Sequence, residues 1–184
     1  MLTFVKFGGS VITDKTGQEA PDLPVIRRLA AEVRAALRAA PPADRLIIGH
    51  GSGSFGHTYA QRYGIHTGLA AGADWMGFAQ TSAAALRLNR IVVDELLAAG
   101  VPAIAFQPAA TLLAERGRLA SWDTASVARA LEHRLVPVVH GDVAFDRAQG
   151  SAIVSTEQLL EALARDPALR PGRVVLVGEA GVFT

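Results

Sequence analysis

The sequence contains no cysteine in its 184 residues, which excludes disulfides, thiolate catalysis and zinc sites built on sulfur. No apolar run approaches the ~20 residues that a membrane-spanning helix needs. The formal net charge is only +1, so bulk charge gives no argument for a nucleic-acid or membrane partner. The N-terminus also lacks the basic segment and long apolar core of a signal peptide. We therefore expect a cytoplasmic protein without a nucleic-acid or membrane partner.

Short apolar runs alternate with helical patterns along a chain whose composition, 50% hydrophobic and 19% charged, is that of a globular protein. The pattern predicts strands within residues 2–7, 45–50, 102–108, 135–142 and 172–183, and helices over residues 23–40, 75–99, 123–134 and 155–165. Strands that are continuously apolar indicate an α/β fold, in which helices cover both faces of a mainly parallel sheet. Ligands of such sheets bind beyond the carboxyl ends of the strands, so function is expected in the loops there.

The first of these loops, KFGGSVITDK, combines two lysines with a glycine turn. Lys6 lies near the end of the first predicted strand, followed by Gly8, Gly9, Ser10 and then Lys15. Glycines let the backbone approach a ligand closely, and consecutive N–H groups can form an anion-binding nest. The loop suits a polyphosphate, and the alternative is a tight strand–helix turn with two solvated lysines. The stretch matches neither a Walker A loop nor the G-x-G-x-x-G of a dinucleotide fold.

The second loop, GHGSGSFGH at residues 49–57, follows the apolar run RLII. Its glycines, together with the hydroxyls of Ser52 and Ser54, offer many donors to an oxyanion. His50 and His57 could ligate a metal, but no acidic third ligand lies beside them in the sequence, so we expect no metal site. We expect His50 to be structural and His57 to donate a hydrogen bond to a phosphate, because a helix N-terminus at that point would favour anions.

Two further loops carry carboxylates. Asp142, which follows Gly141 after the fourth predicted strand, could position a hydroxyl, a lysine or a magnesium shell, or could be an ordinary turn aspartate. Ser155 with Gln158 three residues later forms a capping box at the start of a helix. Glu157 is the one carboxylate near that helix start that could orient a lysine.

The remaining candidates keep a structural interpretation. Trp75, Met76 and Phe78 are expected in the helix core or in a pocket wall, and Asp146 is expected in a turn. His66, His133 and His140 have no constellation of reactive residues around them in the sequence.

Taken together, KFGGSVITDK, GHGSGSFGH and HGDVAFD, in that order and on those elements, resemble the amino acid kinase superfamily. K-x-G-G-S occurs across this superfamily, whereas the I-T-D-K continuation and the G-S-F-G-H ending resemble its isopentenyl phosphate kinase branch. The resemblance implies a three-layer αβα fold, a homodimer, ATP and Mg²⁺ as cofactors, and transfer of the ATP γ-phosphoryl group to isopentenyl phosphate. Fosfomycin kinases share much of these motifs and are the nearest alternative. A non-catalytic module that binds a phosphate ligand is a third possibility.

The resemblance also implies roles for the loop residues. Lys6 and Lys15 would hold the transferring phosphates, and the ATP side would be lined by Gly8, Gly9, Ser10 and Glu157. The acceptor side would be formed by Gly51, Ser52, Gly53 and Ser54, with His57 bonded to the acceptor phosphate and Gly141 and Asp142 at its border. The helix from Trp75 to Thr81 would wall the prenyl tail. The acceptor is already an oxyanion, so this chemistry needs charge cancellation and in-line positioning rather than a strong general base.

Two stretches and the length depart from the resembled pattern. S-G-D-D is usual at the start of the late helix, whereas this chain has S-T-E-Q at residues 155–158, so Glu157 is a longer substitute for an aspartate. T-D-V-D-G is replaced by V-G-E-A-G at residues 177–181. We expect residues 1–184 to form a single domain, mostly the acceptor-binding N-terminal part, with the remainder of the nucleotide-binding lobe absent. An exposed apolar edge is expected where further strands would pair.

Overall fold

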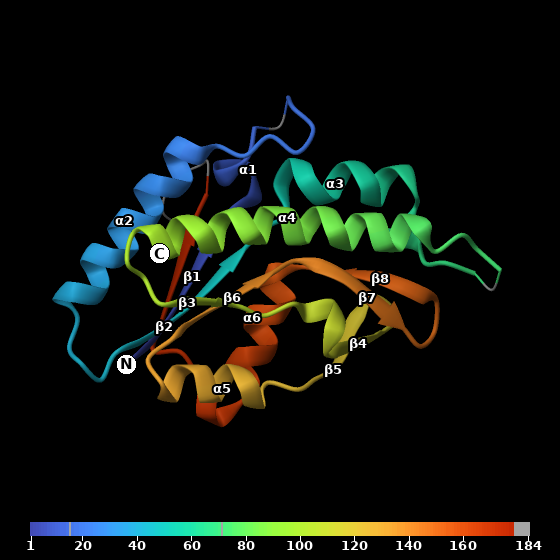
Figure 1. Cartoon of the computed structure of the whole chain (residues 1–184). Helices are drawn as coiled ribbons and strands as arrows, with labels where there is room; N and C mark the ends of the chain where they lie inside the picture. The colour runs from blue at the N-terminus through green and yellow to red at the C-terminus, as the bar shows by residue number, and fades with distance from the viewer. Residues whose placement is uncertain (15, 71, 179–184) are drawn as a thin grey trace.

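A parallel sheet of five strands lies at the centre of the part of the chain that the structure describes, with helices on both faces (Figure 1). Its strands are β1 (Leu2–Phe7), β2 (Arg45–His50), β3 (Ala103–Ala105), β6 (Val136–His140) and β9 (Arg173–Val177). They lie in the order β3-β6-β2-β1-β9, and each neighbouring pair is parallel. The computed structural model describes residues 1–14, 16–70 and 72–178, apart from the side chain of His57. The predicted α/β fold with a mainly parallel sheet is confirmed.

The helices form the outer two of three layers (Figure 1). One face of the sheet is covered by α1 (Gly9–Ile12), α2 (Leu23–Ala39), α3 (Gly53–Arg62) and α4 (Met76–Ala98). The other face is covered by α5 (Ala125–Glu132) and α6 (Thr156–Arg165). Short 3-10 turns lie at Ile65–Thr67, Pro108–Ala110 and Pro167–Leu169. Among the described helices, none is both long enough and apolar enough to cross a bilayer.

The two layers of helices explain why the strands are continuously apolar. Successive side chains of a strand point to opposite faces of the sheet. In β2, Ile48 packs into the cluster under α2 and α4, and its neighbour Ile47 packs into the cluster under α5 and α6. Both side chains are fully buried. A strand in the middle of this sheet therefore has no solvent face that would favour alternating polar residues.

A second, smaller sheet adjoins the first and was not predicted. Its strands are β4 (Leu112–Glu115), β5 (Arg118–Trp122), β7 (Asp142–Asp146) and β8 (Gly150–Val154), in the order β5-β4-β7-β8. The sequence interpretation of residues 143–154 as loops was therefore wrong, and Asp142 begins a strand of the smaller sheet instead of ending the fourth predicted strand. The strands β4, β7 and β8 are short, and pairing with segments distant in sequence, which a local pattern cannot reveal, holds them in place.

Asp146 shapes the two turns of this smaller sheet, as expected of a turn residue. Its carboxylate accepts hydrogen bonds from the backbone N–H groups of Arg116, Gly117, Ala148 and Gln149, over 2.7 to 3.1 Å. Burial acts to raise the pKa of Asp146, but these four donors outweigh it and hold the pKa below its usual range. One side chain thus fixes the β4–β5 turn and the β7–β8 turn together.

The start of α6 and the edge strand β9 bear on two further predictions. The Ser155 hydroxyl accepts a hydrogen bond from the Gln158 N–H at 3.3 Å, so the predicted cap is confirmed. The reciprocal half of the capping box is missing, because Oε1 of Gln158 is buried without a hydrogen-bond partner in the described residues. Strand β9 lies at the edge of the large sheet and exposes 54% of Val174 and 45% of Leu176, which is the apolar edge that was expected.

Candidate active site

A cavity of about 1010 Å³ opens at the carboxyl ends of the central strands β1, β2 and β6. The predicted site residues that line it are Lys6, Gly8, Gly9, Ser10, Gly51, Ser52, Gly53, Ser54, Gly141, Asp142 and Glu157. Residues from four separate segments of the chain are thus brought together around one space, because parallel strands end at the same edge of the sheet. Lys15 and the side chain of His57 lie outside the described residues. The roles of all these residues remain predictions.

The two glycine loops pack directly against each other. A Cβ atom on Gly9 would lie 2.6 Å from the backbone nitrogen of Gly53, and one on Gly51 would lie 2.9 Å from the backbone nitrogen of Gly9. Gly53 has a φ of +48°, and a Cβ atom there would lie 2.6 Å from the carbonyl oxygen of Gly9. No side chain fits at such distances from backbone atoms. The glycines therefore let the loops approach each other, a constraint additional to the ligand approach that the sequence predicted.

The stretch GHGSGSFGH is only partly a loop. Gly51 and Ser52 link β2 to α3, whereas Gly53 and Ser54 form the first turn of that helix. The sequence missed this helix start because three glycines within six residues weaken every helical pattern. The cavity consequently faces the N-terminal end of a ten-residue helix, where the backbone favours an anion.

Thr13 joins the two glycine loops and was not among the predicted site residues. Its hydroxyl donates a hydrogen bond to the carbonyl oxygen of Gly9 at 2.7 Å and accepts one from the Ser54 N–H at 3.0 Å. The hydroxyl of Ser54 in turn accepts a hydrogen bond from the Ala20 N–H at 3.2 Å. Thr13 and Ser54 are both buried. The shape of the glycine loops is thus set by hydroxyl groups behind them.

Lys6 and Glu157 form an ion pair at the wall of the cavity. The ammonium group, near the end of β1, contacts Oε1 of Glu157 in the first turn of α6. Burial acts to raise the pKa of Glu157, but the hydrogen bond and the attraction from Lys6 outweigh it and leave the pKa below its usual range. The carboxylate is therefore ionised at neutral pH and holds the ammonium beside the cavity. The predicted proximity of Glu157 to a lysine is present.

Thr156, the first residue of α6, ties three elements together behind the cavity. Its hydroxyl donates to the carbonyl oxygen of His50 at 2.6 Å and accepts from the Gly141 N–H at 3.0 Å. It thereby connects the ends of β2 and β6 to the start of α6. The Thr156 side chain is 2% exposed, so water does not reach this position. Its two hydrogen bonds therefore satisfy backbone groups that would otherwise be buried without a partner.

His50 and His140 end the paired strands β2 and β6 and stack on each other, with ring centroids 5.6 Å apart. Burial lowers the pKa of both rings, that of His140 to about 3, where the neighbouring His50 adds to the effect. Both rings are therefore neutral at pH 7. Nδ1 lies 3.0 Å from the carbonyl oxygen of Gly51 in His50 and 3.1 Å from that of Gly141 in His140, and Nε2 of His50 lies 3.0 Å from the side-chain amide of Asn89. This arrangement fits the structural role expected of His50. The sequence did not predict that His140 stacks against it.

Asp142 is a buried carboxylate at the border of the cavity. Its side chain is 3% exposed, and Oδ1 accepts a hydrogen bond from the Val143 N–H at 2.8 Å. Oδ2 has no hydrogen-bond partner among the described residues. Burial raises the pKa of Asp142 to about 6, against the opposing effect of the Val143 N–H and the smaller effects of Ser82 and the Ala109 backbone, neither of which forms a hydrogen bond with Oδ2. A charged carboxylate is thus unfavourable here, and the group is poised between its acid and its anion near neutral pH.

We predict that Asp142→Asn stabilises the protein at alkaline pH. The folded pKa of about 6 lies above the unfolded value, so the folded state holds the extra proton between the two. Stability conferred by the neutral form is therefore lost as the pH rises through about 6. Asparagine keeps the acceptor for Val143 without the charge, and urea unfolding should show a gain of about 1–3 kcal/mol at pH 8 and almost none at about pH 3, below the unfolded pKa.

Asp146→Asn is the matched control for this prediction. Asp146 lies on the same strand, but its four N–H donors favour the anion, so loss of its charge should destabilise the protein at pH 8. A gain for Asp142→Asn that is equal at both pH values would show that the Asp142 carboxylate does not titrate as the structure requires.

Other residues of the cavity and its surroundings correct the sequence interpretation. His66, which seemed isolated, lines the cavity. Of the helix segment from Trp75 to Thr81, Thr81 lines the cavity, whereas Trp75 and Met76 are 38% and 56% exposed. Trp75 instead packs with Phe78 and Phe145, with ring centroids 5.2 Å and 5.7 Å away. The helical periodicity of the sequence predicted α4, but it did not predict which of the side chains around its first turn would line the cavity.

Two points concern the donor side of the cavity. Within residues 1–14, 16–70 and 72–178, no three His, Asp or Glu side chains are grouped closely enough to hold a metal ion. Leu176, Val177 and Gly178 line the cavity next to β9, and the remainder of the V-G-E-A-G departure lies outside the described residues.

Comparison with known proteins identifies the relatives of this chain. A profile described as "Amino acid kinase family" matches residues 1–184. The chain is similar to isopentenyl phosphate kinase from Methanothermobacter thermautotrophicus, with 38% identity covering 100% of this chain and 69% of that protein. It is also similar to isopentenyl phosphate kinase from Methanocaldococcus jannaschii, with 32% identity covering 90% of this chain and 65% of that protein. The chain thus spans about two thirds of the length of these relatives.

A solved structure shows the same arrangement of elements. An isopentenyl phosphate kinase determined by X-ray crystallography superposes with a TM-score of 0.87 at 37% identity, covering 96% of this chain and 72% of that one. The parallel sheet, the helices on both faces and the smaller sheet therefore belong to a known architecture.

Proposed function

This chain belongs to the amino acid kinase family, and from that premise we propose that it is an ATP-dependent kinase which converts isopentenyl phosphate into isopentenyl diphosphate. One observation carries the proposal: the cavity in which Lys6, held by Glu157, faces the backbone of two glycine loops. Such a site presents positive charge and backbone donors, which is what the transfer of a phosphoryl group between two anions requires.

The acceptor phosphate occupies the side of the cavity formed by Gly51, Ser52, Gly53 and Ser54. The N-terminal turn of α3 provides a favourable field for its charge. His57, in the same helix, donates a hydrogen bond to this phosphate, and Gly141 and Asp142 border it. The apolar side chains of Ala85, Ile153 and Val154 line the same cavity and suit the hydrocarbon tail of a prenyl phosphate.

The donor phosphates occupy the side formed by Gly8, Gly9 and Ser10. Lys6 and Lys15 neutralise the charge that spreads over the transferring group, and Glu157 keeps Lys6 aligned for this task. Mg²⁺ bound with ATP would supply further positive charge, and it would be held largely by the nucleotide because the described residues offer no cluster of ligands for it. The acceptor oxygen is already an anion, so positioning and charge cancellation suffice without a general base.

The assembly and extent of the protein form a further part of the proposal. The family resemblance supports a homodimer that works in the cytoplasm. It also supports residues 1–184 as one domain, mostly the acceptor-binding part, because the chain spans 69% of the M. thermautotrophicus enzyme.

The test is a direct assay. The protein is incubated with Mg-ATP and isopentenyl phosphate, ADP release is followed, and the affinity for isopentenyl phosphate is measured by calorimetry. Turnover supports the proposal, whereas binding without turnover leaves a phosphate-ligand binding module. If neither turnover nor binding of isopentenyl phosphate is observed, the proposal is contradicted. If fosfomycin is turned over faster in a parallel assay, fosfomycin and not isopentenyl phosphate is the substrate.

We predict that His57→Ala weakens binding of isopentenyl phosphate by about 1.5–3 kcal/mol, the range for a charge-assisted hydrogen bond. Calorimetry of the wild type and the variant measures this difference. His133→Ala, which removes an exposed histidine at the end of α5, is the control and should bind as the wild type does. An unchanged affinity in His57→Ala would remove His57 from the site.

A further inference from the structure

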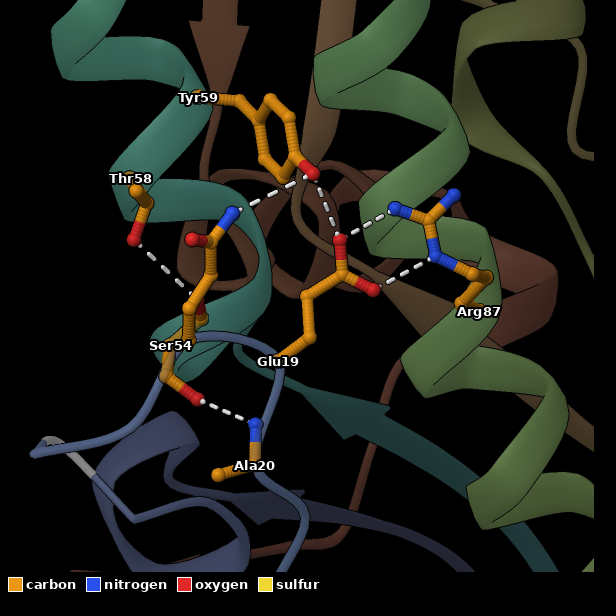
Figure 2. A network of polar contacts seen from close by, with 7 residues as sticks. Glu19, Ala20, Ser54, Thr58, Tyr59 and Arg87 are labelled. Carbon is orange, nitrogen blue, oxygen red and sulfur yellow. Dashed lines mark hydrogen bonds and ion pairs between the residues drawn. The ribbon is translucent and has the colours of Figure 1, made fainter.

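A polar network outside the cavity joins three segments of the chain (Figure 2). The segments are the strap, defined as residues 16–20 between α1 and α2, and the helices α3 and α4. At its centre, the carboxylate of Glu19 accepts a hydrogen bond from Nε of Arg87 at 2.7 Å and a second from Nη2 of the same guanidinium. The hydroxyl of Tyr59 on α3 donates to Oε1 of Glu19 at 2.9 Å. Glu19 thus bonds to both helices at once.

The geometry of this pair makes it more than a solvated charge contact. A two-pronged guanidinium–carboxylate pair fixes the orientation of both side chains, which a single-point contact does not. The hydrogen bond from Arg87 also holds the pKa of Glu19 below its usual range, so the carboxylate is ionised at neutral pH. Tyr59 adds a third donor and accepts a hydrogen bond from Nε2 of Gln18, the preceding strap residue, at 3.4 Å.

The backbone of the strap needs such an anchor. Glu19 has a φ of +50°, a left-handed backbone conformation that residues other than glycine, asparagine and aspartate seldom adopt. The ends of the strap are tied at its base, where the Asp14 N–H donates to the carbonyl oxygen of Ala20 at 2.8 Å. Above this closure, the strap is held to the helices by the side chain of Glu19 and by two backbone donors: the Glu19 N–H, which donates to the carbonyl oxygen of Ser54 at 3.5 Å, and the Ala20 N–H.

The strap reaches the acceptor side of the cavity. The N–H of Ala20 donates to the hydroxyl of Ser54, and Figure 2 shows this bond beside the Glu19 network. Gly17, in the middle of the strap, lines the cavity. Arg87 lies on α4 two residues after Ala85, which also lines the cavity. The network therefore connects the strap, the helix that begins with the acceptor loop and the helix that forms the cavity wall.

We propose that Glu19 is a positioning residue which, through Arg87 and Tyr59, holds the strap against α3 so that Ser54 and Gly17 keep their places around the acceptor phosphate. This inference rests on the proposed function, because that function defines the ligand. Glu19 itself does not line the cavity, so it acts through the strap and not by touching the substrate.

The test compares Glu19→Gln with Glu95→Gln. The control is closely matched: Glu95 lies on α4 and accepts two hydrogen bonds from the guanidinium of Arg27, each at 3.1 Å, but neither residue lines the cavity. Calorimetry should show the Kd for isopentenyl phosphate raised about five- to tenfold by Glu19→Gln and changed less than about twofold by Glu95→Gln. Amide hydrogen exchange should accelerate at residues 16–20 in Glu19→Gln alone.

A charge exchange distinguishes positioning from general damage. The double variant Glu19→Arg with Arg87→Glu restores the pair with reversed polarity and should recover most of the wild-type affinity. A Kd for Glu19→Gln within twofold of the wild type, or an equal loss in Glu95→Gln, would overturn the inference. A wild type that binds no isopentenyl phosphate counts against the proposed function instead, and unchanged exchange at the strap in Glu19→Gln would then overturn the positioning role on its own.

Discussion

Replacing Lys6 by methionine is expected to lower the rate of phosphoryl transfer about 100- to 1000-fold, the usual cost of removing one preorganised charge-stabilising group from an active site. Methionine has a similar length and fills the same space without the charge. The lysine side chain is only 19% exposed and is paired with Glu157, so its position is set before substrate arrives. The measurement is ADP release at saturating Mg-ATP and isopentenyl phosphate, with circular dichroism to verify that the variant is folded.

Two variants separate the charge of Lys6 from its alignment. Glu157→Gln keeps the ammonium but weakens its anchor, and should cost about tenfold. Lys6→Arg keeps the charge but replaces a compact ammonium by a planar fork, so it should not restore full activity.

Chemical modification provides a readout that does not depend on turnover. Lys6 and Lys15 are the two lysines of a chain that otherwise uses arginine, so reductive methylation followed by mass spectrometry can report on each separately. ATP should protect Lys6 from modification. A Lys6→Met rate within about threefold of the wild type, together with unprotected Lys6, would exclude this residue from phosphoryl transfer.

The second large effect is expected for Gly9→Ala, which should lower the free energy of unfolding by about 3 kcal/mol, at the upper end for overpacking. The added Cβ atom would lie 2.6 Å from the backbone nitrogen and 2.9 Å from the Cα atom of Gly53. Backbone atoms cannot move aside as a flexible side chain can, so the two loops must separate. Because these loops line the cavity, the Kd for isopentenyl phosphate should rise at least about tenfold, as measured by calorimetry beside urea unfolding.

Two glycines serve as controls for the two possible causes of such a loss. Gly178 lines the same cavity, but a Cβ atom there would have no atom of the described residues within 4 Å, so Gly178→Ala should change stability by less than about 0.5 kcal/mol. Gly117 has a φ of +75°, and a Cβ atom there would meet only Nε2 of Gln149 at an ordinary contact distance of 3.9 Å, so Gly117→Ala isolates the cost of a left-handed backbone, about 1 kcal/mol. If Gly9→Ala costs no more than Gly117→Ala, the loops are not in the contact described above.

The residues of the site could be predicted from the sequence to different degrees. Lys6, Gly9 and Glu157 were identifiable because they follow strands or begin helices in recognisable motifs. Thr13 and Thr156 were not, because a threonine that bridges two loops has the same local sequence as one that caps a helix or faces solvent. Their importance comes from partners that lie 41 and 106 residues away in the sequence.

The sequence by itself determined the alternation of the five strands of the large sheet with four of the helices, the parallel arrangement of that sheet and the edge at which the ligand loops meet. These follow from local periodicity, since a strand buried on both faces must be apolar throughout and must be connected to its parallel neighbour by a crossover. Only the tertiary structure decided the smaller sheet, the contact between the two glycine loops, and the anchoring of the strap by Glu19 and Arg87. The physical reason is that each of these depends on atoms from segments far apart in the chain, whose meeting is set by packing and not by local propensity.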